Sequence, residues 1–124
     1  ILADFNKSEL DEFMVACKES DLYCVFGGRF LTVSGANSDK GAAITVLTNL
    51  YKAEKHEVIT AAVGDSSNDT PMFENVDWPY LVQRSDRSWV YSPTTNAIKV
   101  AGVGPIGFSM VAADILLRMK EINS

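Results

Sequence analysis

The apolar run Val58–Val63, which ends directly in Gly64 and Asp65, constrains the fold of this chain more than any other stretch. A continuous apolar run, without polar residues at every second position, is typical of a parallel strand that is covered on both faces. In open sheets of parallel strands, ligands bind outside the carboxyl ends of the strands. The run therefore predicts an α/β fold and places Asp65 where polar chemistry is expected.

The segments on either side of this run predict alternating helices and strands. Asn6 and Glu9 have the spacing of a capping box for a first helix, and Ser38 or Asp39 is placed to cap a later one. From residue 40 onward the predicted order is helix, strand, helix, strand, strand, helix, which suggests half of a doubly wound sheet. The predicted helices span 7–19, 41–52, 69–74 and 106–122, and the predicted strands span 22–26, 29–33, 58–63, 79–83 and 97–100. The apolar face of the helix over 41–52 consists of Ala43, Val46, Leu47, Leu50 and Tyr51.

Charge and apolar content argue against two classes of partner. The 124 residues have a net charge of -5 and no cluster of lysine and arginine, which argues against nucleic acid and against an anionic membrane surface. No apolar run approaches the roughly 18–20 residues that are needed to span a bilayer. Cys17 and Cys24 do not make a disulfide framework, so we expect two small buried residues in a reducing cytoplasm.

The segment Gly64–Asp69, with the sequence GDSSND, is a candidate metal and phosphate site. The Asp65 carboxylate is a hard oxygen ligand suited to Mg²⁺, which takes one or two carboxylates together with waters and phosphate oxygens. Asp69 lies one helical turn further and could fix a metal-bound water or hold a cation. The alternative is a polar turn in which an Asp or Asn caps the next helix, and the spacing alone favours neither.

Three further features have more than one interpretation. Lys40 starts a predicted helix, where the helix dipole disfavours it; a bound phosphate would offset the mismatch, but a solvated lysine is the simpler interpretation. The stretch Gly102–Gly107 matches G-x-G-x-x-G, but Pro105 and Gly107 also suit the start of a helix, so we do not predict dinucleotide binding. His56, the single histidine, lies among charged residues and is expected to be solvated.

The pattern GDxxND, together with Lys40 about twenty-five residues upstream, resembles the last two motifs of the haloacid dehalogenase superfamily of phosphatases. Three longer stretches, GGRFLTVSGANSDKGAA, GDSSNDTPMFENVDWPYLVQ and GVGPIGF, together resemble the C-terminal half of the mannosyl-3-phosphoglycerate phosphatase family. The resemblance covers nearly the whole chain. It implies a Rossmann-like core with an inserted α/β cap, in which residues 1–34 would be the C-terminal part of the cap and residues 35–124 the C-terminal part of the core.

The resemblance also implies a role for individual residues. Lys40, Asp65 and Asp69 would be catalytic, with Mg²⁺ on Asp65 and Asp69. The phosphate of a small phosphorylated substrate would bind to Lys40 and Asn68. Arg29, on a cap strand, is a candidate for the glycerate carboxylate or phosphate, because a guanidinium can hold planar anions with two hydrogen bonds. Arg29 could equally be a surface residue at the edge of the strand, without contact to a substrate.

One part of the family's chemistry has no match in the sequence. Enzymes of this superfamily form an aspartyl-phosphate on a D-x-D motif of the first core strand and then hydrolyse it, and these 124 residues, which begin at Ile1, contain no D-x-D. We therefore expect a fragment of a Mg-dependent mannosyl-3-phosphoglycerate phosphatase that is inactive as a bare chain. Its partner would be the missing N-terminal half or a second copy. Two alternatives remain open: a phosphatase of the same superfamily acting on another sugar phosphate, and a free-standing, non-catalytic half-domain used for binding or assembly.

Overall fold

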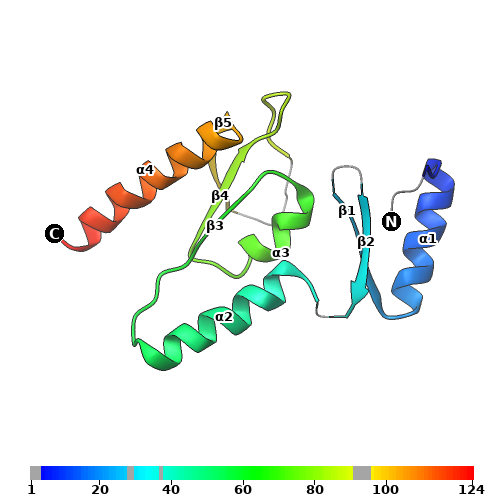
Figure 1. The fold of residues 1–124 in the computed structure, drawn as a ribbon, viewed down its shortest axis with the longest axis horizontal. Coiled ribbons are helices and arrows are strands. Elements are labelled where there is room, and N and C mark those ends of the chain that lie inside the picture. The colour runs from blue at the N-terminus through cyan, green and yellow to red at the C-terminus, as the bar shows by residue number, and fades with distance from the viewer. Residues whose placement is uncertain (1–3, 28–29, 37, 91–95) are drawn as a thin grey trace.

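The computed structural model describes residues 4–27, 30–36, 38–90 and 96–124. Within these ranges the chain forms an antiparallel pair of strands near the N-terminus and a parallel sheet of three strands (Figure 1). Helices pack against both sheets, so the predicted α/β class is confirmed. The predicted boundary between cap and core, at residues 34 and 35, stays a prediction.

The first unit has one helix and two strands: α1 (Lys7–Glu19), β1 (Leu22–Gly27) and β2 (Phe30–Gly35). The capping box of α1 is confirmed, because the Glu9 amide donates to Asn6 Oδ1 at 2.9 Å and the Asn6 amide donates to Glu9 Oε2 at 3.1 Å. Both cysteines are free thiols. Cys17 is buried as expected, whereas Cys24 is only half-buried.

The hairpin of β1 and β2 has a regular antiparallel register. Tyr23 lies opposite Ser34, and Val25 lies opposite Thr32. Residues directly opposite each other in an antiparallel pair point to the same face, and alternate residues of a strand share that face. The hairpin therefore presents these four side chains together on one face.

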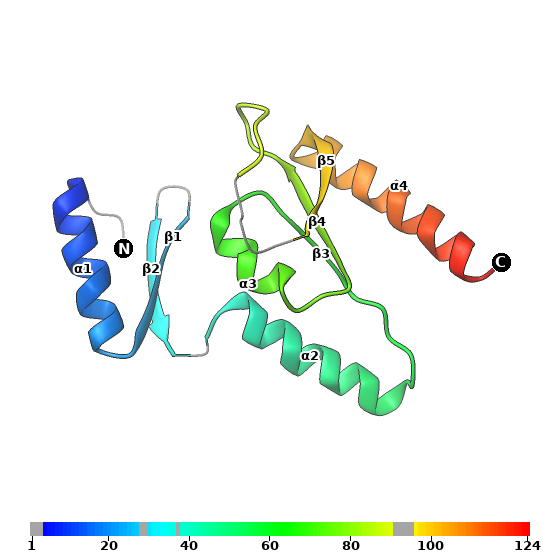
Figure 2. The ribbon, with the colours of Figure 1, turned by 180° about the vertical axis from the view of Figure 1, so that it is seen from behind.

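The second unit has three strands and the helices around them: α2 (Lys40–Glu54), β3 (Ala61–Gly64), η1 (Ser67–Asp69), α3 (Thr70–Phe73), β4 (Trp78–Gln83), β5 (Ile98–Val103) and α4 (Pro105–Ile122). The strands are parallel in the order β3-β4-β5. Both ribbon views show α4 on one side of this sheet and α2 with α3 on the other (Figures 1 and 2). None of the helices in the described ranges is both long and apolar enough to cross a membrane.

Each face of the parallel sheet has a small apolar core. The buried residues are Ala62, Phe73 and Leu81 on the side of α3, and Tyr80, Val82 and Val111 on the side of α4. A polar contact also links α4 to the sheet: the Tyr80 hydroxyl donates to Asp114 Oδ2 at 2.7 Å, and Arg118 Nε donates to the same oxygen at 2.7 Å. Burial, with this hydrogen bond, raises the pKa of Tyr80 to about 12.

The strand predicted over 58–63 begins only at Ala61, which corrects its predicted start. The Asp77 carboxylate accepts from the Thr60 amide at 2.8 Å and from the Thr60 hydroxyl at 2.9 Å. The Thr60 carbonyl in turn accepts from the amides of Asp77 and Trp78 at 3.1 and 2.9 Å. These contacts hold Thr60 against the turn before β4, so regular strand pairing starts one residue later.

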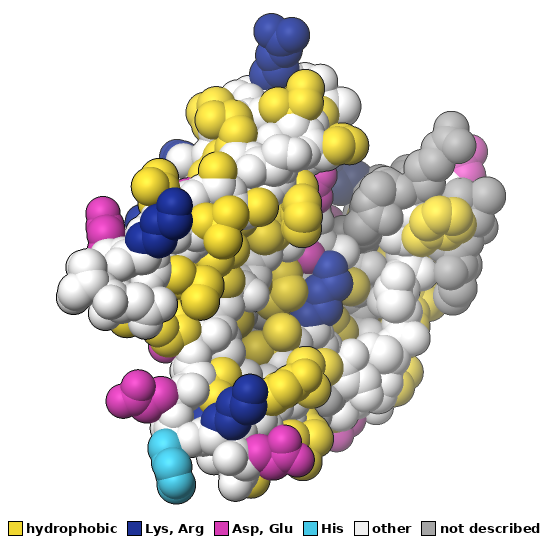
Figure 3. Space-filling view, turned by 60° about the vertical axis from the view of Figure 1, so that its left-hand side comes forward, with side chains coloured by type: hydrophobic (Ala, Val, Ile, Leu, Met, Phe, Trp, Pro, Cys, Tyr) yellow, Lys and Arg dark blue, Asp and Glu magenta, His cyan; other side chains and the backbone are white. Residues whose placement is uncertain are grey.

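The apolar face predicted for α2 is exposed rather than buried. Val46, Leu47, Leu50 and Tyr51 are between 52% and 63% exposed. Among the described residues β3 pairs only with β4, which leaves the other edge of β3 free, and Ala61 is exposed against the expectation of coverage on both faces. Figure 3 shows hydrophobic side chains gathered on the side of the molecule where α2 and α4 end.

The glycines of the stretch Gly102–Gly107 let β5 and α4 meet at close range. Gly102 has a φ of +130°, which side chains rarely permit. A Cβ atom on Gly107 would lie 2.6 Å from the Gly102 carbonyl oxygen and 3.0 Å from Val82 Cβ. Close packing accounts for Gly102 and Gly107, and the positive φ of +54° accounts for Gly104, around which a Cβ atom would meet nothing within 4 Å.

Candidate functional site

The candidate site lies where the carboxyl end of β3 approaches the first residue of α2. Lys40 Nζ forms an ion pair with Oδ1 of Asp69, the last residue of η1. The Asp69 side chain is 7% exposed and that of Lys40 is 52% exposed, so the ammonium group remains open to solvent. The structure thus brings together two of the predicted site residues from segments far apart in the sequence.

The Asp69 carboxylate also organises the loop after β3. Its Oδ2 accepts hydrogen bonds from the amides of Asp65 and Ser66, at 3.1 and 3.2 Å, and from the Ser66 hydroxyl at 3.2 Å. Gly64 leaves the space for this arrangement, because a Cβ atom there would overlap the Asp69 carboxylate. Since both of its oxygens are engaged, Asp69 is suited to position Lys40 and the loop; its role as a metal ligand stays a prediction.

The start of α2 places the Lys40 ammonium at the positive end of a helix dipole, with the carboxylates of Asp39 and Asp69 beside it. Asp39 is the N-cap, because its side chain accepts from the Ala42 amide at 2.8 Å. The first turn of α2 contains no acidic residue, so the positive end of the helix dipole adds to the charge of Lys40. Asp69 pairs with the Lys40 ammonium, whose side chain is still 52% exposed, so this ammonium and the helix terminus together offer donors to an anion.

Asp65 carries an exposed carboxylate on the loop whose backbone Asp69 holds. It is exposed, and its side chain has no hydrogen-bond or ion-pair partner among the residues that the structure describes. Across the described ranges, no group of three or more His, Cys, Asp or Glu side chains is placed to hold a metal ion. The donors fit Mg²⁺ only as one carboxylate ligand in a shell that water and phosphate oxygens would complete.

Asn68 faces a small pocket between the core and the hairpin. Its Oδ1 accepts from the Ser66 hydroxyl, and its NH₂ group donates to none of the residues that the structure describes, so it can donate to a ligand. Asn68 and Lys40 line a pocket of about 210 Å³. The other lining residues are Tyr23, Val25, Thr32, Ser34, Ser38 and Asp39. This pocket joins the phosphate-binding candidates to one face of the hairpin.

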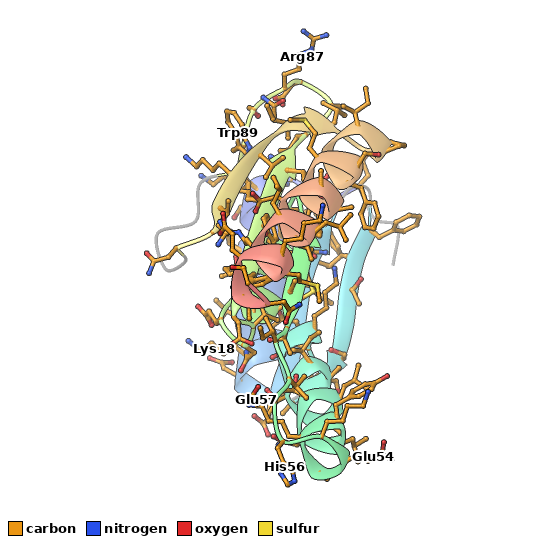
Figure 4. The ribbon with its side chains drawn as sticks, turned by 90° about the vertical axis from the view of Figure 1, so that its left-hand side faces the viewer. Lys18, Glu54, His56, Glu57, Arg87 and Trp89 are labelled. Carbon is orange, nitrogen blue, oxygen red and sulfur yellow. The ribbon has the colours of Figure 1, made fainter. Side chains whose placement is uncertain are left out.

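Two residues considered from the sequence are not part of this arrangement. Arg29 lies outside the described residues, so its contact with a substrate carboxylate stays a prediction. His56 is exposed, as expected, at the end of the sheet opposite the loop that holds Trp89 (Figure 4). A cavity of about 680 Å³ opens beside His56 at the amino end of β3, and Asp65 lies at the other end of that strand.

Sequence reasoning missed some residues of the site. Ser66, which donates to both Asn68 and Asp69, was present in GDSSND but had no predicted role. Thr32 and Ser34 lie two positions apart in a strand, and that period of two was the available signal that they share a face.

Comparison with known proteins covers the larger part of the chain. The family of haloacid dehalogenase-like hydrolases matches residues 1–90. A glucosyl-3-phosphoglycerate/mannosyl-3-phosphoglycerate phosphatase of Methanococcoides burtonii is 43% identical over 97 residues, which are 77% of this chain and 35% of the relative. A mannosyl-3-phosphoglycerate phosphatase of Pyrococcus furiosus is 52% identical over 45% of this chain and 22% of the relative. The mannosyl-3-phosphoglycerate phosphatase of Pyrococcus horikoshii is 47% identical over 64% of this chain and 30% of the relative. The matched region therefore spans about a third or less of each of these relatives.

Proposed function

The chain belongs to the haloacid dehalogenase-like hydrolases, and from this premise we propose that it is part of a phosphoric monoester hydrolase acting on mannosyl-3-phosphoglycerate. The observation that supports the proposal is the meeting of Lys40, Asp69 and the exposed Asp65 at the carboxyl end of a parallel strand. This is the edge at which parallel sheets bind ligands. The names of the relatives supply the proposed substrate.

Each residue has a separate task in this proposal. Lys40 binds the transferring phosphoryl group and offsets its negative charge, because its ammonium is held by Asp69 yet open to solvent. Asn68 donates its free NH₂ group to a phosphate oxygen. Asp65, with support from Asp69, would hold Mg²⁺, which when bound neutralises further charge on the phosphoryl oxygens.

The attacking group of the reaction is not in this sequence. Phosphoryl transfer to an aspartate, followed by hydrolysis of the aspartyl-phosphate, needs a nucleophilic carboxylate in line with the phosphate. The sequence contains no D-x-D, and Asp69 has both oxygens engaged. We therefore propose that the bare chain is inactive and works with the N-terminal half of the same enzyme, or with a second copy, in the cytoplasm.

A second sugar is a specific alternative. The relatives from Methanococcoides burtonii and Persephonella marina are named for both glucosyl- and mannosyl-3-phosphoglycerate. A glucosyl ester is therefore a second candidate substrate for the complete enzyme.

Binding of inorganic phosphate to the bare chain tests the part of the proposal that this chain can perform. We expect millimolar binding of phosphate, seen as shifts of the amide signals of residues 40 and 68 in NMR spectra. Mg²⁺ should strengthen this binding in the original chain, and in the Asp65→Asn variant Mg²⁺ should have no effect on it. Lys40→Met should abolish the binding, whereas Lys52→Met, in the last turn of the same helix, should not. Equal binding by the two lysine variants would contradict the proposal. Phosphate release from an ester by the bare chain, lost in Asp65→Asn, would contradict its inactivity.

A further inference from the structure

The two cysteine thiols of the chain lie against each other, and the proposed phosphate chemistry uses neither of them. The sequence contains two cysteines, Cys17 and Cys24, and both are free thiols. The Cys24 thiol shares a side-chain hydrogen bond with the Cys17 thiol. A disulfide requires two cysteines whose Cα atoms lie within about 7 Å and whose side chains point toward each other. Two thiols in contact are therefore the starting arrangement for a disulfide.

The short turn between α1 and β1 brings these thiols together. Cys17 lies two residues before the last residue of α1, and Cys24 lies two residues after the first residue of β1. Only Ser20 and Asp21 connect the two elements, and Asp21 has a φ of +58°, which is a turn conformation. The chain reverses at this turn and α1 packs against β1. The fold thus places the two cysteines at matching distances from the turn, on facing elements.

The pair can be reached from solvent through Cys24. Cys17 is only 5% exposed, whereas Cys24 is half-buried and lines a pocket of about 320 Å³ together with Lys18. Successive side chains of a strand point to opposite faces, and the two neighbours of Cys24 in β1 line the pocket of Lys40. Cys24 therefore lies on the other face of the strand, toward α1, and the thiol pair is separate from the phosphate-binding candidates.

We propose that Cys17 and Cys24 form a reversible disulfide that cross-links α1 to β1 when the chain meets a small-molecule disulfide such as oxidised glutathione. The Cys24 thiolate attacks one sulfur of the oxidant, which gives a mixed disulfide and releases one glutathione thiolate. The Cys17 thiolate then attacks the Cys24 sulfur and releases the second glutathione thiolate. The two protein thiols lose two electrons and two protons, and the oxidant is reduced to two thiols. This inference does not depend on the proposed function.

The surroundings of the pair indicate how it reacts. Burial, and then the hydrogen bond with Cys17, raises the pKa of the Cys24 thiol. Because the thiolate is the attacking species, the exchange is slow at neutral pH. Disulfides that form in reducing compartments are usually transient and redox-sensing. The pair therefore responds to a sustained rise in disulfide oxidants and is not a permanent part of the fold.

Equilibration of the folded chain in glutathione buffers tests the proposal. The reduced 124-residue chain is held at about pH 8, near the ordinary pKa of a cysteine thiol, over a series of ratios of reduced to oxidised glutathione. After alkylation of the free thiols, mass spectrometry detects the disulfide as the loss of two hydrogen atoms, and peptide mapping identifies the link. The same series in urea gives the unfolded reference. We expect half-oxidation of the folded chain at a ratio at least about ten-fold more reducing than in urea, because the fold holds the thiols together.

Two single variants separate the steps. Cys17→Ala should stop at the mixed disulfide of glutathione with Cys24, and Cys24→Ala should leave the buried Cys17 unmodified. Half-oxidation at the same ratio in the folded and unfolded chain would disprove the proposal. So would a covalent dimer, or a glutathione adduct on Cys24 of the original chain that never closes to the disulfide. Thermal unfolding shows whether each variant is folded; if one is not, the comparison of the folded with the unfolded original chain decides alone.

Discussion

A Cβ atom added to Gly64 would fall inside the Asp69 carboxylate, which holds both Lys40 and the loop after β3. The position is therefore more constrained than its backbone suggests, because Gly64 does not have a positive φ. The constraint comes from a charged side chain that the fold places against the strand. At the scale of single residues, this glycine couples the backbone of β3 to the proposed binding of phosphate.

We predict that Gly64→Ala lowers the free energy of unfolding by about 1–3 kcal/mol, the usual cost of forcing extra atoms into a packed site. It should also weaken phosphate binding, because Asp69 must move away from Lys40. Urea unfolding and the NMR titration measure the two effects. Gly35→Ala is the matched control, since its Cβ would meet only Ser38 Oγ, at 3.8 Å. Equal destabilisation by both variants would contradict the role assigned to Gly64.

Part of the site could be predicted from single residues and part could not. Lys40, Asp65 and Asp69 stood out because each is a charged residue at a predicted element boundary, and a family resemblance joined them. The engagement of both Asp69 oxygens could not be predicted, because it depends on how the turn through Ser66 folds back under β3. The position of a carboxylate in sequence does not tell whether its oxygens are already paired.

At the scale of elements, the start of β3 depends on a contact between segments that are distant in sequence. Thr60 and Asp77 are linked through two hydrogen bonds to the Asp77 carboxylate and two involving the Asp77 amide. These hydrogen bonds join the residue before β3 to the residue before β4. It sets where the parallel pairing of the two strands begins.

We predict that Asp77→Ala lowers the free energy of unfolding by about 1 kcal/mol at neutral pH, the usual net loss for such hydrogen bonds at an exposed site. Hydrogen bonding from the Thr60 amide lowers the pKa of Asp77, partly opposed by burial. Its contribution is therefore complete above the unfolded pKa of about 4 and is lost as the pH falls through the lower folded pKa. Urea unfolding from pH 7 down to pH 2 should show the difference between original and variant shrinking in acid. Glu57→Ala, a change at an exposed acidic residue near the start of β3, should show no such pattern.

The elements were predictable where local signals decide them. The capping box of Asn6 and Glu9 fixed the start of α1, and the order of elements after residue 40 followed from hydrophobic periodicity. The start of β3 was not predictable from the apolar run, because Val58 and Ile59 have the composition of a strand while Asp77 decides where pairing starts. Periodicity also identified the apolar face of α2, but it cannot say whether anything covers that face.

At the scale of the whole molecule, two surfaces stand out that a doubly wound sheet normally covers: the edge of β3 that no described strand pairs with, and the exposed face of α2. The α2 face is more than half exposed at Val46, Leu47, Leu50 and Tyr51. Exposed apolar patches of this kind mark interaction surfaces or cause aggregation.

We predict that the bare chain self-associates at micromolar concentrations and that Leu50→Lys weakens this association. Leu50 is 63% exposed, so the free energy of unfolding should change by less than about 0.5 kcal/mol. Sedimentation velocity over a concentration series measures the association. Val15→Lys on α1, at a residue that is 56% exposed, makes the same change in charge and should leave the association unchanged. A chain that remains monomeric at all concentrations would contradict the prediction and show that the exposed α2 face does not drive association.

The meeting of β5 and α4 has a consequence for anyone who searches genomes with short patterns. Gly102, Gly104 and Gly107 match the G-x-G-x-x-G pattern that is used to identify dinucleotide-binding proteins, so a search with that pattern would retrieve this chain. This chain and the dinucleotide-binding proteins share the pattern because both must bring a strand and a helix into close contact. Here the space that the last glycine leaves is filled by the Gly102 carbonyl of the protein itself. A pattern search that also asked what occupies that space would separate the two groups.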